Sequence, residues 1–128
     1  MADKRAAERA GRGAERRAGW LLMLKGYRIV ARRYSCSAGE IDLVAVRRRT
    51  YAFVEVKARP TEEAALRSVS ERNWQRIARA AEVYQARHLN TMTADIRFDL
   101  VTVVRGWPRH YPDFWRPHGT PTRPRRRR

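Results

Sequence analysis

Apolar residues near the start of the chain recur every three or four positions, a period that predicts a helix over residues 4–25. Gly11 and Gly13 weaken its first turns and favour a start near Ala14, while Gly26 is placed to end it. The face that we expect to be buried consists of Ala14, Ala18, Leu21 and Leu22.

The next part of the chain changes to the two-residue period of β-strands, and a later segment returns to it. The strands predicted in this way span residues 27–34, 40–46, 51–58 and 95–104. Between the last two, Ser68 and Glu71 have the spacing of a capping box, which predicts a helix ending near Asn90. The shared face of that helix is Ile77, Ala81, Tyr84 and His88.

The order of these elements is helix, three strands, helix, strand, which predicts an α/β fold. Strands joined by short links pair antiparallel, and a helix before the last strand is long enough for a crossover to a parallel neighbour. A mixed sheet with one helix on each face is a three-layer sandwich. We expect one domain over residues 1–115. The prolines after Gly106 and the arginines of residues 116–128 indicate an extended or disordered basic tail.

Three carboxylates and a lysine lie among the apolar residues of the second and third strands. If the turn centres on Arg48 and Arg49, residues whose numbers sum to 97 pair across this hairpin. Asp42 then lies opposite Glu55 and Glu40 opposite Lys57, on one face of the sheet. Phe53 shares that face, and the other face is filled by Ile41, Leu43, Val54 and Val56.

Two carboxylates at this separation repel each other unless a cation bridges them or one is protonated. Hard oxygen ligands favour Mg²⁺ or Mn²⁺, and Lys57 could stabilise charge on a phosphate. The alternative is structural: a surface salt bridge between Glu40 and Lys57, with Asp42 capping a bulge. The apolar neighbours and the spacing of the charged residues favour the metal site over that alternative.

The formal net charge of +16 indicates a polyanionic partner, because neutralised phosphates release counterions. Residues 1–115 still carry +10 without the tail. No apolar span or amphipathic anchor supports a membrane as partner. Arg32 and Arg33 precede the acidic strand and could contact phosphate, or form a solvated strand edge. The tail could tether nucleic acid or only keep the protein in solution, through Arg125, Arg126, Arg127 and Arg128.

Other residues that could carry chemistry are better explained by structure. Arg97 and Asp99 are expected to form a structural ion pair, and packing is favoured over base stacking for Trp74, Trp107 and Trp115. The lone Cys36 excludes an internal disulfide, and the scattered histidines give no zinc spacing. With no apolar signal segment at the N-terminus, these features predict a cytoplasmic protein.

The motif Gly39-Glu40-Ile41-Asp42-Leu43, together with Phe53-Val54-Glu55-Val56-Lys57, resembles the YraN-like family of small bacterial proteins. That family belongs with the restriction-endonuclease-like PD-(D/E)xK nucleases and is similar to archaeal Holliday junction resolvases. The resemblance covers residues 13–114. It implies a restriction-endonuclease-like three-layer sandwich.

The resemblance also implies roles for individual residues. Asp42 and Glu55 would be metal ligands, the Val56 carbonyl a third ligand, and Lys57 the catalytic lysine, with Glu15 added from the first helix. The alternative for Glu15 is a charge on the helix surface that pairs with a nearby lysine or arginine. The chain departs from the pattern at the start of the second helix. Where the family carries Lys-Gln, this sequence has Asn73-Trp74, and Gln75 could take that role one position later.

These observations lead to two functional hypotheses. The first is a nuclease that depends on Mg²⁺ or Mn²⁺ and acts on structured or branched DNA. The second is an accessory protein that binds nucleic acid without catalysis. A basic scaffold for protein or RNA assembly is a weaker third reading. The sequence leaves the oligomeric state open, a homodimer included.

Overall fold

The computed structural model describes residues 2–89 and 94–117, with side chains from Gly11 onward. Eight elements follow one another along the chain. They are α1 (Ala2–Leu24), β1 (Arg28–Cys36), β2 (Gly39–Arg47), β3 (Thr50–Ala58), α2 (Glu62–Leu66), α3 (Glu71–His88), β4 (Asp95–Val104) and β5 (Trp107–Trp115). None of the helices in the described ranges is long and apolar enough to cross a bilayer.

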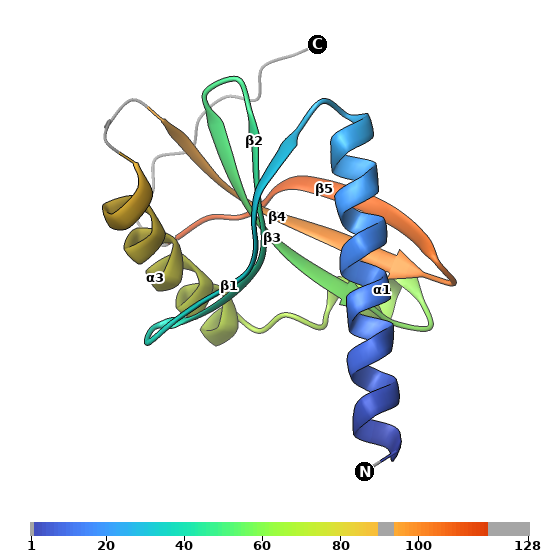
Figure 1. Ribbon diagram of the computed structural model, residues 1–128. Helices are drawn as coiled ribbons and strands as arrows, with labels where there is room; N and C mark the ends of the chain where they lie inside the picture. The colour runs from blue at the N-terminus through green and yellow to red at the C-terminus, as the bar shows by residue number, and fades with distance from the viewer. Residues whose placement is uncertain (1, 90–93, 118–128) are drawn as a thin grey trace.

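The five strands form one mixed sheet in the order β1-β2-β3-β4-β5, with α1 against one face and α3 against the other (Figure 1). Only β3 and β4 run parallel, and the chain between them passes through α2 and α3. Parallel neighbours need such a crossover, whereas the other pairs are antiparallel hairpins. The predicted α/β sandwich is therefore confirmed.

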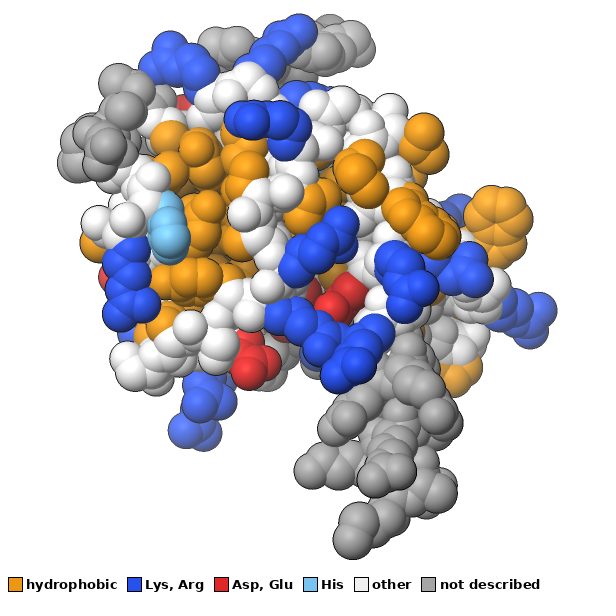
Figure 2. Space-filling view, in the orientation of Figure 1, with side chains coloured by type: hydrophobic (Ala, Val, Ile, Leu, Met, Phe, Trp, Pro, Cys, Tyr) orange, Lys and Arg blue, Asp and Glu red, His pale blue; other side chains and the backbone are white. Residues whose placement is uncertain are grey.

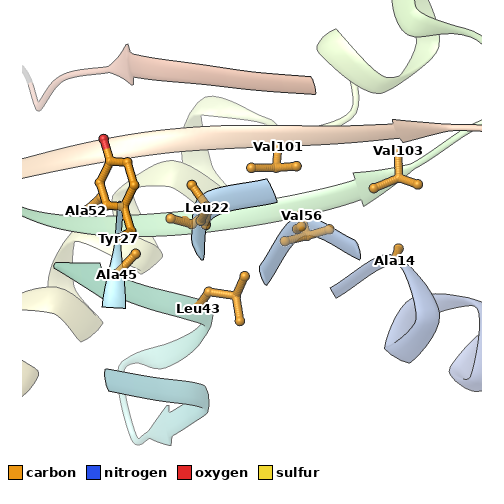
Figure 3. Packing of buried hydrophobic residues seen from close by; sticks show 11 residues of the cluster. Ala14, Leu22, Tyr27, Leu43, Ala45, Ala52, Val56, Val101 and Val103 are labelled. Carbon is orange, nitrogen blue, oxygen red and sulfur yellow. The ribbon is translucent and has the colours of Figure 1, made fainter. Parts of the chain in front are cut away.

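Helix α1 covers one face of the sheet with small and branched side chains. Ala14, Ala18 and Leu22 are buried, as the helical period predicted, whereas Leu21 is only partly buried. The buried three pack on valines, alanines and one leucine of the sheet (Figure 3). The helix begins at Ala2, so Gly11 and Gly13 lie inside it and the expected start near Ala14 is wrong. Its end is as predicted, because Gly26 has a φ of 93°.

Helix α3 covers the opposite face, and its start differs from the prediction. The N-cap is Ser70, whose Oγ accepts a hydrogen bond from the Asn73 N–H at 3.1 Å. Ser68 instead donates to the Ala65 carbonyl at the end of α2, a short helix that the sequence pattern did not predict. On the predicted face, His88 is exposed, while the buried members are Ile77, Ala81 and Tyr84.

The segment after Gly106 is a strand, so the prediction that an extended or disordered tail begins there is wrong. Arg105 and Gly106 have φ values of 51° and 81° and form a two-residue turn into β5. Pro108 and Pro112 are tolerated because β5 is an edge strand. The tail over residues 118–128, including Arg125–Arg128, lies outside the described residues.

The three tryptophans considered for base stacking differ in their environments. Trp74 is buried and stacks on Trp115, with ring centroids 5.7 Å apart and an interplanar angle of 8°. Packing was the correct prediction for these two. Trp107 is 76% exposed at the start of β5, so the packing prediction for it is wrong.

A fully buried carboxylate fastens β5 to the rest of the sheet. Asp99 on β4 accepts two hydrogen bonds from the guanidinium of Arg97, at 2.8 and 2.7 Å, and lies 2.7 Å from His110 Nε2 on β5. The pairing of β4 with β5 shifts register here, and Asp113, with a φ of 55°, donates its backbone N–H to Asp99 at 2.9 Å. The predicted structural ion pair is thus confirmed.

Burial opposes ionisation of Asp99, but the hydrogen bonds from Arg97 and His110 outweigh it and lower the pKa of this carboxyl. Because the pKa of Asp99 is lower in the folded protein than the ordinary value of 3.8, ionised Asp99 stabilises the fold at pH values above 3.8. That contribution is lost as the pH falls through the pKa of the folded state. Asp99 is therefore one reason to expect acid unfolding of this fold.

We expect Asp99→Asn to lower the free energy of unfolding by about 3–5 kcal/mol, because it removes the fully buried counter-charge of the partly buried Arg97. Urea unfolding at pH 7 measures the change. The control is Glu63→Gln, which breaks an exposed ion pair with Arg67 and should cost less than about 1 kcal/mol. Equal effects in the two variants would contradict a structural role for the buried pair.

Candidate active site

The candidate site lies where the pairing of β2 with β3 ends. Residues pair from Leu43–Val54 to Arg47–Thr50, and each pair sums to 97, so the predicted register is confirmed over this stretch. The ladder ends one residue before Asp42 and Glu55, which are therefore not the directly opposed pair that we predicted. Instead, the Val56 N–H donates to Asp42 Oδ2 at 2.8 Å, so the Asp42 side chain takes the place of the next backbone contact.

The alternation of β2 between the two faces of the sheet breaks at Asp42. Leu43 packs under α1, whereas Ile41 packs under α3, so the prediction that both fill one face is wrong. The neighbouring strand breaks at the same level. Arg33 of β1, with a φ of 51°, lies between the residues that pair with Leu43 and Ile41. A non-glycine residue with positive φ is uncommon and is typical of functional sites.

A cleft with a volume of about 650 Å³ opens at this break. It brings together all five residues for which the sequence predicted a metal or catalytic role: Glu15, Asp42, Glu55, Val56 and Lys57. Figure 2 shows acidic side chains recessed among lysine and arginine side chains on this face of the molecule. Glu40 also lines the cleft, but it pairs with Ser35 of β1, and the ion pair found for Lys57 is with Glu55.

Glu55 is the buried member of the acidic group, with only 7% of its surface exposed. Burial, a hydrogen bond with Asp42 and the charge of Asp42 together raise the pKa of Glu55 to about 9. Lys57 Nζ lies 4.0 Å from Glu55 Oε2, and Asn73 Nδ2 of α3 donates to the same oxygen at 3.4 Å. The ionisation of Glu55 is therefore opposed both by burial and by the second acid beside it, as expected where two carboxyls lie close together.

The donor atoms of this pair suit a hard divalent cation. No group of three His, Cys, Asp or Glu side chains placed to share a metal occurs within residues 11–89 and 94–117. Two carboxylates with water completing the coordination are the usual ligand set of Mg²⁺ in proteins. Glu15, the expected third carboxylate, instead accepts a hydrogen bond from Arg33 Nε at 2.9 Å. Asp42 and Glu55 thus supply the two carboxylates of such a ligand set, and Glu15 lines the same cleft.

The structure separates the residues that were predicted to bind nucleic acid. Arg33 lies beside the cleft through its bond to Glu15, while the Arg32 guanidinium lies over Gly19 of α1. Gln75 is exposed on α3 and is not part of the cleft wall. The role at the start of this helix that we had assigned to Gln75 suits Asn73 instead, because Asn73 contacts Glu55 directly.

Two further arginines in the cleft wall, Arg59 and Arg76, were missed by the sequence analysis. Neither has a distinguishing local pattern. Asn73, by contrast, had a usable signal. Had Ser70 been identified as the N-cap, Asn73 would have been placed in the first turn of α3, three residues later.

A mixed sheet between two helices, with a carboxylate pair and a lysine at the end of a central hairpin, defines a restriction-endonuclease-like α/β protein. The sequence model described as "Uncharacterised protein family UPF0102" matches residues 14–103, and the chain belongs to that family.

Relatives of similar length support this assignment. The chain is similar to UPF0102 proteins of Parvibaculum lavamentivorans (50% identity, covering 88% of this chain and 85% of the relative) and Methylorubrum extorquens (49%, 88% and 88%). The same holds for a UPF0102 protein of Brucella canis (47%, 88% and 90%).

The raised pKa of Glu55 makes stability depend on pH. Between pH 4.5, the ordinary value, and about 9, the folded protein binds a proton that the unfolded chain has lost. The free energy of unfolding therefore falls as pH rises through this window. Glu55→Gln should raise the stability of the protein in EDTA at pH 8, on the order of 1–3 kcal/mol, and flatten the profile from pH 5 to 8. Urea unfolding across this range measures it, and a profile as steep as that of the wild type would contradict the assignment.

Proposed function

We propose that this protein is a metal-dependent nuclease that hydrolyses phosphodiester bonds in structured or branched DNA. The observation that carries the proposal is the pair of half-buried Asp42 and buried Glu55 with Lys57 beside it, in a cleft that arginines help to line. A divalent ion bound between two carboxyls this close would relieve the repulsion between them.

Each residue of the pair is held in place by the fold. The Val56 N–H fixes Asp42, and Asn73 fixes Glu55, so both would present oxygens to Mg²⁺ or Mn²⁺. When bound, the metal would activate water and neutralise charge on the phosphate. The Lys57 ammonium, 4.0 Å from Glu55, is in position to stabilise the extra negative charge of the attacked phosphate.

A second groove, about 440 Å³ in volume, supports a polyanionic substrate. It shares Ala14, Ala58 and Arg59 with the active-site cleft, so the two are continuous. Its charged wall residues are Arg17, Arg59 and Arg105, and none of them has a carboxylate partner among the described side chains. Uncompensated arginines beside the carboxylate pair provide a path for the phosphates that flank the cleaved bond.

Cleavage of labelled four-way junction DNA, with linear duplex and single strands alongside, tests the proposal. We expect products with Mg²⁺ or Mn²⁺ and none with EDTA. Asp42→Asn and Lys57→Ala should each reduce the rate about 10²–10³-fold or more. Glu63→Gln, far from the cleft wall, serves as the matched control. Cleavage at the wild-type rate in both site variants would exclude this site as the catalytic centre.

An accessory protein that binds DNA without cutting it is the second candidate, and the ion pair that occupies Glu15 favours it. Its binding would depend steeply on salt but not on divalent metal. Comparing affinities for the junction in EDTA and in Ca²⁺ separates the candidates. A metal-dependent gain that Asp42→Asn abolishes contradicts pure binding.

The groove can be tested apart from catalysis. Arg59→Ala and Arg105→Ala should each weaken junction binding in EDTA and reduce the slope of log affinity against log salt by about 1. Arg79→Ala, which removes an exposed arginine of α3 outside both clefts, is the control. Fluorescence anisotropy at several salt concentrations measures the slope. Equal slopes for all three variants would reject the groove as a phosphate path.

A further inference from the structure

Arg33 is bonded to Glu15, the site residue that the resemblance adds from the first helix. Its Nε donates to Glu15 Oε2 at 2.9 Å, and the two side chains are 47% and 20% exposed, respectively. The charges of Glu15, Asp42 and Glu40 all favour the charged form of this guanidinium. Arg33 therefore lies beside the cleft, bonded to Glu15 and within the electrostatic influence of Asp42 and Glu40.

The backbone of β1 is arranged to place Arg33 there. Its φ of 51° breaks the alternation of the strand, so that Arg32 lies against α1 while Tyr34 packs under α3. A non-glycine residue in this conformation costs roughly 1 kcal/mol or more. The fold tolerates this cost at Arg33, which lies between the two β1 residues that pair with Leu43 and Ile41. Arg33 is therefore at the level of Asp42.

We propose that Arg33 is a phosphate-contacting residue that is held by Glu15 in the metal-free protein and passes to the substrate phosphate when a divalent ion engages Glu15. The inference rests on the proposed function and extends it. A metal ion and the Arg33 guanidinium would compete for the carboxylate of Glu15. A doubly charged ion at Asp42 and Glu55 also repels Arg33. The displaced Arg33 guanidinium, which lies beside the cleft, is then free to bind the substrate phosphate.

Competition of this kind predicts opposite effects on two ligands. Removing Arg33 should strengthen metal binding, because the ion no longer displaces a partner from Glu15, and should weaken binding of DNA in the presence of metal. Glu15→Gln should do the reverse: it should weaken metal binding, and it should strengthen DNA binding in EDTA because Arg33 is released. A purely structural ion pair would not produce this reciprocal pattern.

The experiment uses the full chain and two readouts without cleavage. Mn²⁺ affinity is measured by calorimetry, and junction affinity by anisotropy in EDTA and in Ca²⁺. The variants are Arg33→Gly, which suits the positive φ, Arg33→Lys, which keeps the charge but lacks Nε, and Glu15→Gln. Arg32→Ala removes the same charge one residue away and is the matched control. Urea unfolding verifies that each variant is folded.

We expect Arg33→Gly to bind Mn²⁺ at least about fivefold more tightly than Arg32→Ala, and to bind the junction in Ca²⁺ at least about fivefold more weakly. Arg33→Lys should fall between Arg33→Gly and the wild type. If the wild type binds Mn²⁺ but Arg33→Gly matches Arg32→Ala in both affinities, the exchange is wrong and the proposed nuclease stands. If the wild type binds no Mn²⁺, the metal site and the exchange both fall.

Discussion

The repulsion between Asp42 and Glu55 is the constraint around which this end of the sheet is organised. Both carboxyls are held by neighbouring groups, Asp42 by the Val56 N–H and Glu55 by Asn73, so neither can move away from the other. Burial then leaves two ways to satisfy the pair, a shared proton or a bridging cation. The surrounding residues are consistent with this requirement, since Lys57 and the arginines of the cleft wall supply positive charge close by but do not form a close contact with Asp42.

A second buried carboxylate in the same sheet shows the contrast. Asp99 is satisfied completely within the chain, by a two-pronged arginine, a histidine and a backbone N–H, and its pKa is lowered. Glu55, at similar depth, has its pKa raised by burial and by the neighbouring Asp42, because its nearest partner is another acid. The carboxylate of Asp99 is thus satisfied by groups of the chain, whereas that of Glu55 lies beside a second acid. This difference between two carboxylates in one sheet is the physical reason to look for function at Glu55 and for stability at Asp99.

Much of this arrangement could be predicted from the sequence, and the failures have specific causes. The register of β2 with β3 followed from a two-residue turn at Arg48 and Arg49, and the turn is real, with Arg48 at a φ of 56°. The reversal of faces at Ile41 was not predictable, because it depends on an arginine that adopts positive φ without any local glycine signal. Strand β5 was missed because the sequence does not distinguish prolines in a loop from prolines on an edge strand. The cleft wall from α1 and α3 needed the tertiary structure.

The prolines of β5 have a consequence for how copies of this protein can meet. A sheet with five strands has two edges, and open edges recruit other strands through their unpaired backbone groups. Pro108 and Pro112 remove two N–H donors from β5, which makes that edge a poor template for an incoming strand. The opposite edge, β1, carries a bulge at Val30 that interrupts its own regular pattern. Both borders of the sheet therefore carry features that disfavour aggregation by strand addition.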